Sequence, residues 1–351
     1  EQNPCPGDMK KANYDRTIGA RTYDVIRYLL PLAAKTNVGQ VVSIRTLEKQ
    51  ITRLLSAQLP ELQGIGEDLK EALSKVPSSV WADLQEESAY KLEPLAPTLA
   101  RYAGANEYQG SVYRDLLRQL KGHIKQAGVE DPNAWTGCDQ TVDLLEPHSP
   151  LDELVTTLVY RVSQAPYRVL LQWVQGWSEK EKQEVVDAAI KNRGPHDELA
   201  KEFRSGYAFI FDVLMDIGGW RDMHRHRRCQ QVQQNFTTVH GYDVPAILGK
   251  AGVEKEYRQA MDAVRQDIDR LRGVNQEAAL YAIPFGFRVR CLFKMDFAEV
   301  EYISKLRSGV KGHWSYRTVA WLMKQKMVER YPYLGNLIHA TPPDVEDVLK
   351  R

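Results

Sequence analysis

The sequence predicts an α+β fold in which a twisted, mainly antiparallel sheet is flanked by long helices, and in which helix predominates. Apolar residues recur at helical spacing in residues 43–55, 151–163, 178–191 and 253–271. Two shorter runs, residues 207–215 and 279–293, are rich in aromatic and β-branched residues and are typical of strands. Long helices beside a few strands indicate this fold class.

Local signals support several of these helices. Ser43 stands where an N-cap is expected, before the apolar positions Ile44, Leu47 and Ile51. Ser178 and Glu181 have the spacing of a capping box, in which each side chain bonds the backbone N–H of the other residue. Shorter helices are predicted at residues 67–73, 81–87, 113–126, 299–306 and 313–328.

Composition limits the classes of function. The chain has 351 residues, with 47 basic and 46 acidic side chains and a formal net charge of +1, so no global field draws it to nucleic acid or membrane. The four cysteines are scattered, which predicts free thiols in a reducing cytoplasm. No long apolar stretch predicts a membrane span. The chain opens at Glu1 without a methionine, so we expect a truncated or processed product.

An internal echo predicts a tandem organisation. The segment around Pro31 precedes the helix that starts after Ser43, and the segment around Pro284 precedes another predicted helix at the same spacing. The two stretches can be aligned with each other without gaps. We therefore divide the chain into three parts. Residues 1–75 are the back half of a first repeat, residues 76–150 are a helical connecting region, and residues 151–351 are a second, full-length repeat.

The run from His224 to Arg228 is the most unusual local feature, with three arginines and two histidines in a neutral chain. Arginine offers a planar fork for phosphate, and histidine can donate to a ring carbonyl or a phosphate oxygen. The run therefore suits an anionic ligand that carries an aromatic ring system. The alternative is a solvated basic face. No carboxylate or cysteine stands at metal-ligand spacing, so no metal site is predicted.

The triplet Arg225-His226-Arg227 resembles the start of the R-H-R-x-x-S-x-N-E-x-S-x-R-Y signature of flavin-dependent thymidylate synthases. Two further segments follow in that family's order: the turn that ends at Pro284, and the stretch with Leu306-Arg307 and later Trp314. The first repeat carries the same turn around Pro31, with Arg27 at its arginine position and Arg45 in a later triplet. Gly194-Pro195-His196 is similar to a further, shifted landmark.

The resemblance implies reductive methylation of dUMP to dTMP, with FAD as cofactor and with NADPH and methylenetetrahydrofolate as co-substrates. It also implies a homo-oligomer with sites between repeats. By resemblance Arg307 has the catalytic position, near the nucleotide base. The implied cofactor-binding residues are Arg225, His226, Arg227, His196 and Arg45. The implied substrate-binding residues are Arg225, Gln233, Asn235, Arg307 and Arg27.

The signature positions after the triplet depart from the family pattern. Gln233 replaces the glutamate, Asn235 the serine over the base, Thr237 the phosphate-gripping arginine and Thr238 the tyrosine. Asp296 replaces the asparagine of the later triplet, and we expect it to repel a flavin phosphate. These changes leave two alternatives open: a non-catalytic homologue with a structural or regulatory role, and a flavoenzyme that acts on another nucleotide.

Overall fold

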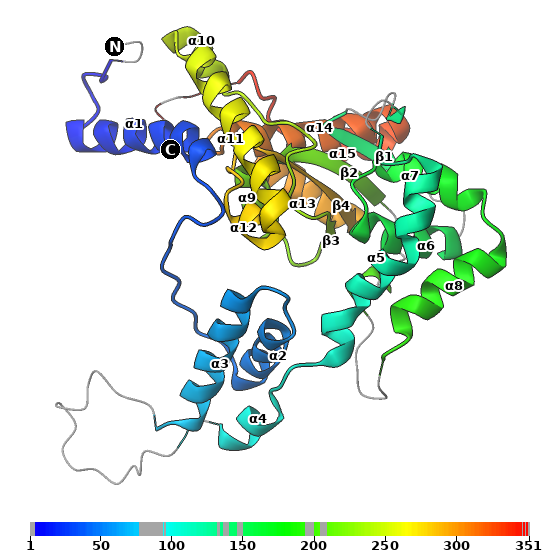
Figure 1. The fold of residues 1–351 in the computed structure, drawn as a ribbon. Helices are drawn as coiled ribbons and strands as arrows, with labels where there is room; N and C mark the ends of the chain where they lie inside the picture. Colours follow the sequence, from blue (N-terminus) through cyan, green and yellow to red (C-terminus); the bar gives the residue numbers. More distant parts are fainter. Residues whose placement is uncertain are drawn as a thin grey trace. The chain divides into compact units, whose positions relative to one another are not determined.

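The computed structural model describes residues 4–76, 94, 96–131, 134–135, 140–145, 150–193, 200–203, 209–345, 347 and 349. It is helix-rich with one four-stranded sheet, which confirms the predicted α+β class (Figure 1). All paired strands run antiparallel, in the order β1-β2-β4-β3. The strands are β1 Val142–Leu145, β2 Phe209–Asp216, β3 Gln230–Gln233 and β4 Arg288–Met295.

The chain divides into two compact units. The first comprises residues 1–35, 120–185 and 201–351, and the second comprises residues 36–119 and 186–200. This division does not follow the predicted repeats, because the first predicted repeat contributes to both units. The repeat boundaries therefore stay a prediction.

The sheet of the first unit has one apolar face. The alternating residues Phe211 and Val213 of β2 stand opposite Phe293 and Cys291 of β4, and all four are fully buried. Helix α14, Trp314–Arg330, lies against β1 and β2 and adds Met323 to this core. Since both partners of each pair point to the same side, β2 and β4 bury one continuous apolar surface.

The opposite face of the same strands carries buried charge. Arg290 donates from Nη1 to Oδ2 of Asp212 at 2.8 Å, and both side chains are almost fully buried. The Asp212 carboxylate also accepts from the Tyr160 hydroxyl of α6, Pro150–Val162, at 3.1 Å. Four residues further along β4, on the same face, Lys294 Nζ donates to Glu153 of α6 at 2.6 Å. Helix α6 is therefore attached to the sheet by an ion pair and by the Tyr160 hydrogen bond.

Two proline turns of the first unit, residues 28–33 and 281–286, pair with each other, and we call this pairing the proline clasp. Pro31 and Pro284 form an antiparallel bridge. Four backbone hydrogen bonds flank the bridge in a two-fold arrangement, so that each turn donates twice and accepts twice. The bonds are Leu32 N to Ile283 O, Phe285 N to Leu30 O, Ala33 N to Tyr281 O and Gly286 N to Tyr28 O.

The helices that follow the two turns also begin alike. Helix α2, Ile44–Leu55, is capped by Ser43, whose hydroxyl group accepts from Thr46 N. Helix α13, Phe297–Arg307, is capped by Asp296, whose carboxylate accepts from Glu299 N. Ser43 follows Pro31 at the same distance in the sequence as Asp296 follows Pro284. The tandem repeat itself stays a prediction.

The second unit is helical. Helix α2 packs against α3, Pro60–Ser74, and α4, Pro97–Tyr102. Its small core is formed by aliphatic and alanine side chains: Ile51, Leu55, Leu73, Ala96, Ala100 and Ala103. In the first unit, the counterpart helix α13 packs instead on α14.

Most predicted helices are confirmed within a few residues. The remaining helices are α1 Lys11–Ile26, α5 Glu107–Ala127, α7 Tyr167–Gln175, α8 Glu179–Ile190, α9 Ile217–Met223, α10 Ala246–Ala251, α11 Glu254–Val274, α12 Gln276–Tyr281 and α15 Pro332–Leu337. The capping box is confirmed, because Ser178 N donates to Glu181 and Glu181 N donates to Ser178. The predicted helix at residues 81–87 lies outside the described residues.

One expectation was wrong in part. Residues 279–281 of the predicted strand region belong to α12, because Asn275 caps a helix there by accepting from Ala278 N, and the strand is Arg288–Met295. Strand β1 was not predicted.

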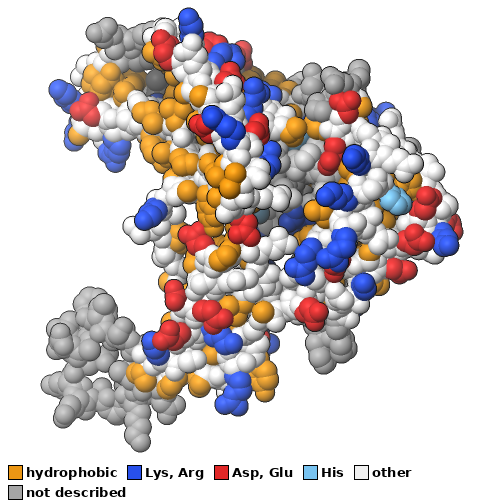
Figure 2. Space-filling view, viewed as in Figure 1, with side chains coloured by type: hydrophobic (Ala, Val, Ile, Leu, Met, Phe, Trp, Pro, Cys, Tyr) orange, Lys and Arg blue, Asp and Glu red, His pale blue; other side chains and the backbone are white. Residues whose placement is uncertain are grey.

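Surface properties agree with the composition. On the face shown in Figure 2, Lys and Arg side chains are interspersed with Asp and Glu, in agreement with the formal net charge of +1. Among the described residues, no helix is long and apolar enough to cross a membrane. Cys5, Cys229 and Cys291 are free thiols, whereas Cys138 lies outside the described residues.

The buried ion pair gives a test of the fold. Replacing Asp212 with Ala leaves the Arg290 guanidinium group buried without this carboxylate, so we expect a loss of about 3–5 kcal/mol in the free energy of unfolding. Urea denaturation measures this loss. The matched control is Asp267→Ala, which removes an exposed ion pair with Arg270 and is expected to cost less than about 1 kcal/mol. Equal losses in the two variants would contradict the assignment.

Candidate functional site

The basic run is delivered by a short helix that begins at the end of β2. Asp216 is the N-cap of α9, and its Oδ1 accepts from Gly219 N at 2.6 Å. Helix α9 is anchored by Trp220 and Met223, which belong to the main core. The run from His224 to Arg228 then connects α9 to β3. Because both neighbouring elements are packed on the sheet, this segment has fixed ends.

One residue of the run is buried. His226 is buried, whereas the flanking Arg225 and Arg227 are exposed. The predicted ligand-binding triplet is therefore not a uniform basic face, because its central residue points inward and its arginines point to solvent.

His226 meets the side chain of Arg307 from α13. The Arg307 Nε donates to His226 Nε2 at 2.8 Å, and on the other side of the ring Nδ1 lies 3.4 Å from Oε1 of Glu299. Burial, and secondly the charge of Arg307, lowers the pKa of His226 to about 4. His226 is therefore neutral near pH 7, and two residues predicted to bind the ligand contact each other directly.

Arg225 shares a carboxylate with a residue of the first predicted repeat. The Asp222 carboxylate lies 3.2 Å from Arg225 Nη2 and 3.6 Å from Arg27 Nη1. The Arg225 side chain is 72% exposed, whereas that of Arg27 is only 15% exposed. Among the described residues, the buried Nε and Nη2 atoms of Arg27 have no hydrogen-bond partner. The structure thus brings Arg27 to Arg225.

Asp296 has a different role from the one that we expected. Its Oδ1 caps α13 by accepting from Glu299 N at 2.9 Å, and its Oδ2 accepts from Arg228 Nη2 at 2.7 Å. Since Arg228 pairs with this carboxylate, the expected repulsion of a phosphate is offset locally.

The departing signature positions form a short stretch that starts in β3. Gln233 is the last residue of β3 and pairs with Cys291. The Asn235 Oδ1 accepts from Arg161 at 3.0 Å, and the Thr237 hydroxyl group accepts from Val239 N at 3.1 Å. Asn235 and Thr237 thus make contacts within the chain.

Two predicted cofactor-binding residues stay predictions. Arg45 belongs to α2 in the second unit. His196 lies outside the described residues. Among the described residues, no group of three His, Cys, Asp or Glu side chains could hold a metal ion.

Sequence reasoning missed Asp222 and Glu299. Asp222 precedes Arg225 by three residues, which is one helical turn, and Glu299 follows the cap Asp296 at the same spacing. A search for acidic residues one turn from each basic landmark would have found Asp222. Glu299 has no basic landmark one turn away, so its contact with His226 depends on the tertiary packing.

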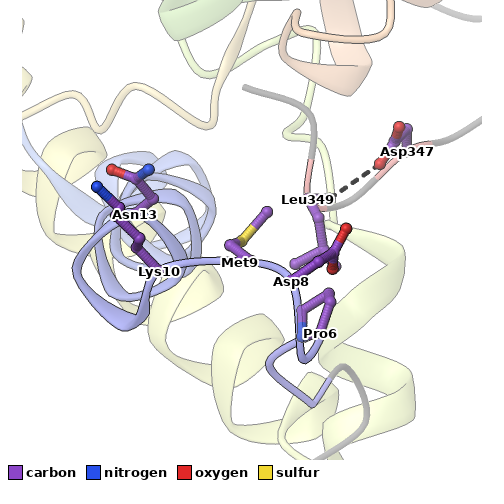
Figure 3. A pocket seen from close by; sticks show the side chains of 7 residues that line it. All are labelled: Pro6, Asp8, Met9, Lys10, Asn13, Asp347 and Leu349. Atoms are coloured by element: carbon purple, nitrogen blue, oxygen red, sulfur yellow. Dashed lines mark hydrogen bonds between the residues drawn. The ribbon is translucent and has the colours of Figure 1, made fainter.

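A cavity lies elsewhere in the first unit (Figure 3). It is lined by Pro6, Asp8, Met9, Lys10, Asn13, Asp347 and Leu349. None of the predicted site residues contributes to it.

A buried acidic group supports the base of α9. The second carboxylate oxygen of Asp216 contacts the Ser315 hydroxyl group at the start of α14. Burial, and secondly the charge of Asp243, raises the pKa of Asp216 from 3.8 to about 6. The Arg27 guanidinium group and the two hydrogen bonds act in the opposite direction. The helix that precedes the basic run is therefore capped by a carboxyl group whose ionised form is disfavoured by burial.

This group predicts a pH dependence of stability. The folded pKa of Asp216 is raised, so its contribution to stability is present below the unfolded pKa and is lost as the pH rises through about 6. Asp216→Asn keeps an oxygen acceptor for Gly219 N but cannot ionise. We expect the variant to gain about 3 kcal/mol relative to the wild type between pH 4 and pH 8. Urea denaturation of both proteins across this range measures the difference, and parallel pH profiles would contradict the assignment.

Comparisons with known proteins agree with these landmarks. A family model described as thymidylate synthase complementing protein matches residues 148–333. A UPF0159 protein of Chlamydia pneumoniae is 27% identical over 347 residues, covering 93% of this chain and 59% of that protein. A flavin-dependent thymidylate synthase of Sulfolobus acidocaldarius is 23% identical over 197 residues, covering 50% of this chain and 75% of the relative.

A solved structure shows a weaker likeness. The flavin-dependent thymidylate synthase of Helicobacter pylori, complexed with FAD and dUMP, is 15% identical with a TM-score of 0.32, and the match covers 56% of this chain and 99% of that one. The chain spans only 59% of the length of the Chlamydia pneumoniae relative and 61% of a related UPF0159 protein from Thermoplasma acidophilum. The family model covers more than half of the chain, including the basic run, α13 and α14. This chain belongs to the thymidylate synthase complementing protein family.

Proposed function

We propose that this chain binds FAD and a nucleotide at the basic run and catalyses the reductive methylation of dUMP to dTMP, with methylenetetrahydrofolate and NADPH as co-substrates. The family match and the similarity to flavin-dependent thymidylate synthases support the reaction class. The observation that carries the proposal is the meeting of Arg307 and His226, which the family pattern places far apart in the sequence.

The residues at the run fit an anionic cofactor. Arg307 uses Nε for His226, and among the described residues its two terminal amino groups have no hydrogen-bond partner. Arg225 and Arg227 are exposed. Arginine groups of this kind hold phosphate through paired N–H bonds. Arg225 and Arg227 would hold FAD, which supplies the hydride chemistry when bound. The two ring nitrogens of His226 face Arg307 and Glu299, so the predicted role of His226 in binding FAD would be exerted through Arg307.

The nucleotide phosphate has a second set of candidates. Arg27 and Arg225 both face Asp222, and the remaining Arg27 nitrogens are buried without a partner among the described residues. A phosphate group could displace the Asp222 carboxylate from between the two arginines. The larger charge of the phosphate would make its interaction with the arginines stronger. On this proposal the first repeat supplies Arg27, while Arg225 and Arg307 come from the second. Arg45 and His196 remain proposed cofactor contacts.

The assembly and location that go with this activity are also proposals. A homo-oligomer would bring the second unit, with Arg45, to the basic run of another copy. A reducing cytoplasm suits the free thiols.

One observation favours a second candidate, a non-catalytic homologue that still binds nucleotide or flavin. Gln233, Asn235 and Thr237 carry no charge, and Asn235 and Thr237 contact Arg161 and Val239. Removing a charge-assisted phosphate contact costs about 1.5–3 kcal/mol. A flavoenzyme acting on another nucleotide would also tolerate these changes.

Flavin binding is the first measurement. We expect the purified protein to take up FAD, with a flavin absorption spectrum, and Arg225→Ala to raise the dissociation constant by roughly tenfold or more. Arg270→Ala is the matched control, because Arg270 is an exposed arginine of α11 that pairs only with Asp267 among the described residues. A wild-type protein that does not take up FAD would contradict both proposed enzyme functions, the methylation of dUMP and a flavin-dependent reaction on another nucleotide.

Turnover separates the remaining candidates. NADPH oxidation that requires dUMP and methylenetetrahydrofolate, with release of dTMP, is the expected result. FAD binding without NADPH oxidation would favour the non-catalytic homologue, and NADPH oxidation that ignores dUMP would favour another nucleotide.

A further inference from the structure

Glu299 is a buried acidic residue beside the basic run that the sequence analysis did not identify. It lies in the first turn of α13, where its backbone N–H is fixed by the Asp296 cap at 2.9 Å. The residue is only 4% exposed. A carboxylate in this setting needs a partner, because burial of an unpaired charge is costly. Burial raises the pKa of Glu299, and the nearby Arg228 opposes that rise.

The partner is the ring of His226, and the hydrogen bond on the far side of the ring requires the same tautomer that Glu299 favours. Arg307 Nε is always a donor, so it bonds His226 Nε2 only when Nε2 carries no proton. The single ring proton of a neutral histidine then sits on Nδ1. Nδ1 is the atom that faces Glu299 Oε1 at 3.4 Å.

We propose that Glu299 is a positioning residue that holds His226 as the Nδ1–H tautomer and thereby aims the Arg307 side chain at the ligand. With the ring held this way, Nε2 faces Arg307 and retains its Nε, so the two terminal amino groups of Arg307 are left for an anion. In the other tautomer the ring proton is on Nε2, so Nε2 could not accept from Arg307 Nε and this hydrogen bond would be lost.

The surrounding groups support this arrangement. Tyr302 of α13 places its ring 5.7 Å from the His226 ring, nearly edge-on, which limits rotation of the imidazole. Tyr316 of α14 lies 5.7 Å from the Arg307 guanidinium carbon. The other charged groups near this contact are Arg228 and Asp296, which pair with each other. Glu299 thus contacts His226, and His226 contacts Arg307, so the three residues form one chain of contacts between α13 and the basic run.

The tautomer can be measured without any ligand. Nitrogen-15 NMR of the His226 ring in the full chain is expected to show protonated Nδ1 and unprotonated Nε2 between pH 6 and pH 8. In Glu299→Gln the carboxamide oxygen can still accept, so the single tautomer is retained. In Glu299→Ala we expect a mixture of the two tautomers. The control Glu301→Ala removes another carboxylate of α13 and should leave the spectrum unchanged.

The inference rests on the proposed function only for its ligand readout. In that readout, Glu299→Ala raises the FAD dissociation constant by roughly tenfold, and Glu299→Gln stays within about twofold of the wild type. If the wild type does not bind FAD, the NMR result still decides the role of Glu299. An Ala variant with the wild-type tautomer would overturn the proposal.

A variant that fails to fold does not remove the test. Glu299→Asp keeps the charge but shortens the side chain by one methylene group, so it should lose the single tautomer while Glu299→Gln keeps it. The opposite order would show that charge rather than reach matters, and would also overturn the proposal.

Discussion

The proline clasp is the contact on which the site depends. It joins residues 28–33 to residues 281–286 through four backbone hydrogen bonds, so the link does not depend on particular side chains at these positions. The clasp fixes Tyr28 in the main core and holds Arg27 beside Asp222. Without it, the first-repeat arginine would have no fixed place near the basic run. A main-chain constraint thus determines which side chains can meet at the site.

The pairing of β2 with β4 provides the second constraint on the site. Strand β2 ends at Asp216, whose carboxylate begins α9, and β4 ends one residue before Asp296, which begins α13. The two strands are paired along their full length. Consequently α9 and α13 start from opposite ends of one strand pair, and the segments after α9 and within α13 come together at His226 and Arg307.

Sequence reasoning predicted the helices well because their apolar spacing and caps are local signals. It was less successful around residue 280, where the apolar residues are typical of a strand but the Asn275 cap, a local signal that was overlooked, starts a helix. It also failed where tertiary contacts decide. The basic run was found from the sequence because clustered arginines are unusual in a neutral chain. Its division into a buried His226 and exposed arginines depends on the packing of α9 and α13, and no local pattern contains that information.

Acidic residues that contact the basic run change what the site requires of a ligand. Asp222 faces Arg225, Asp296 pairs with Arg228, and Glu299 faces His226. A ligand phosphate must therefore compete with carboxylates that are already in place, and only the surplus of its interaction energy appears as affinity. The exception is Arg307, whose terminal amino groups have no competing carboxylate among the described residues. Because Arg307 is held through Nε alone, it can receive an anion without first breaking an ion pair. The chemistry of the site thus depends most on this arginine, and on the neutral histidine that holds it.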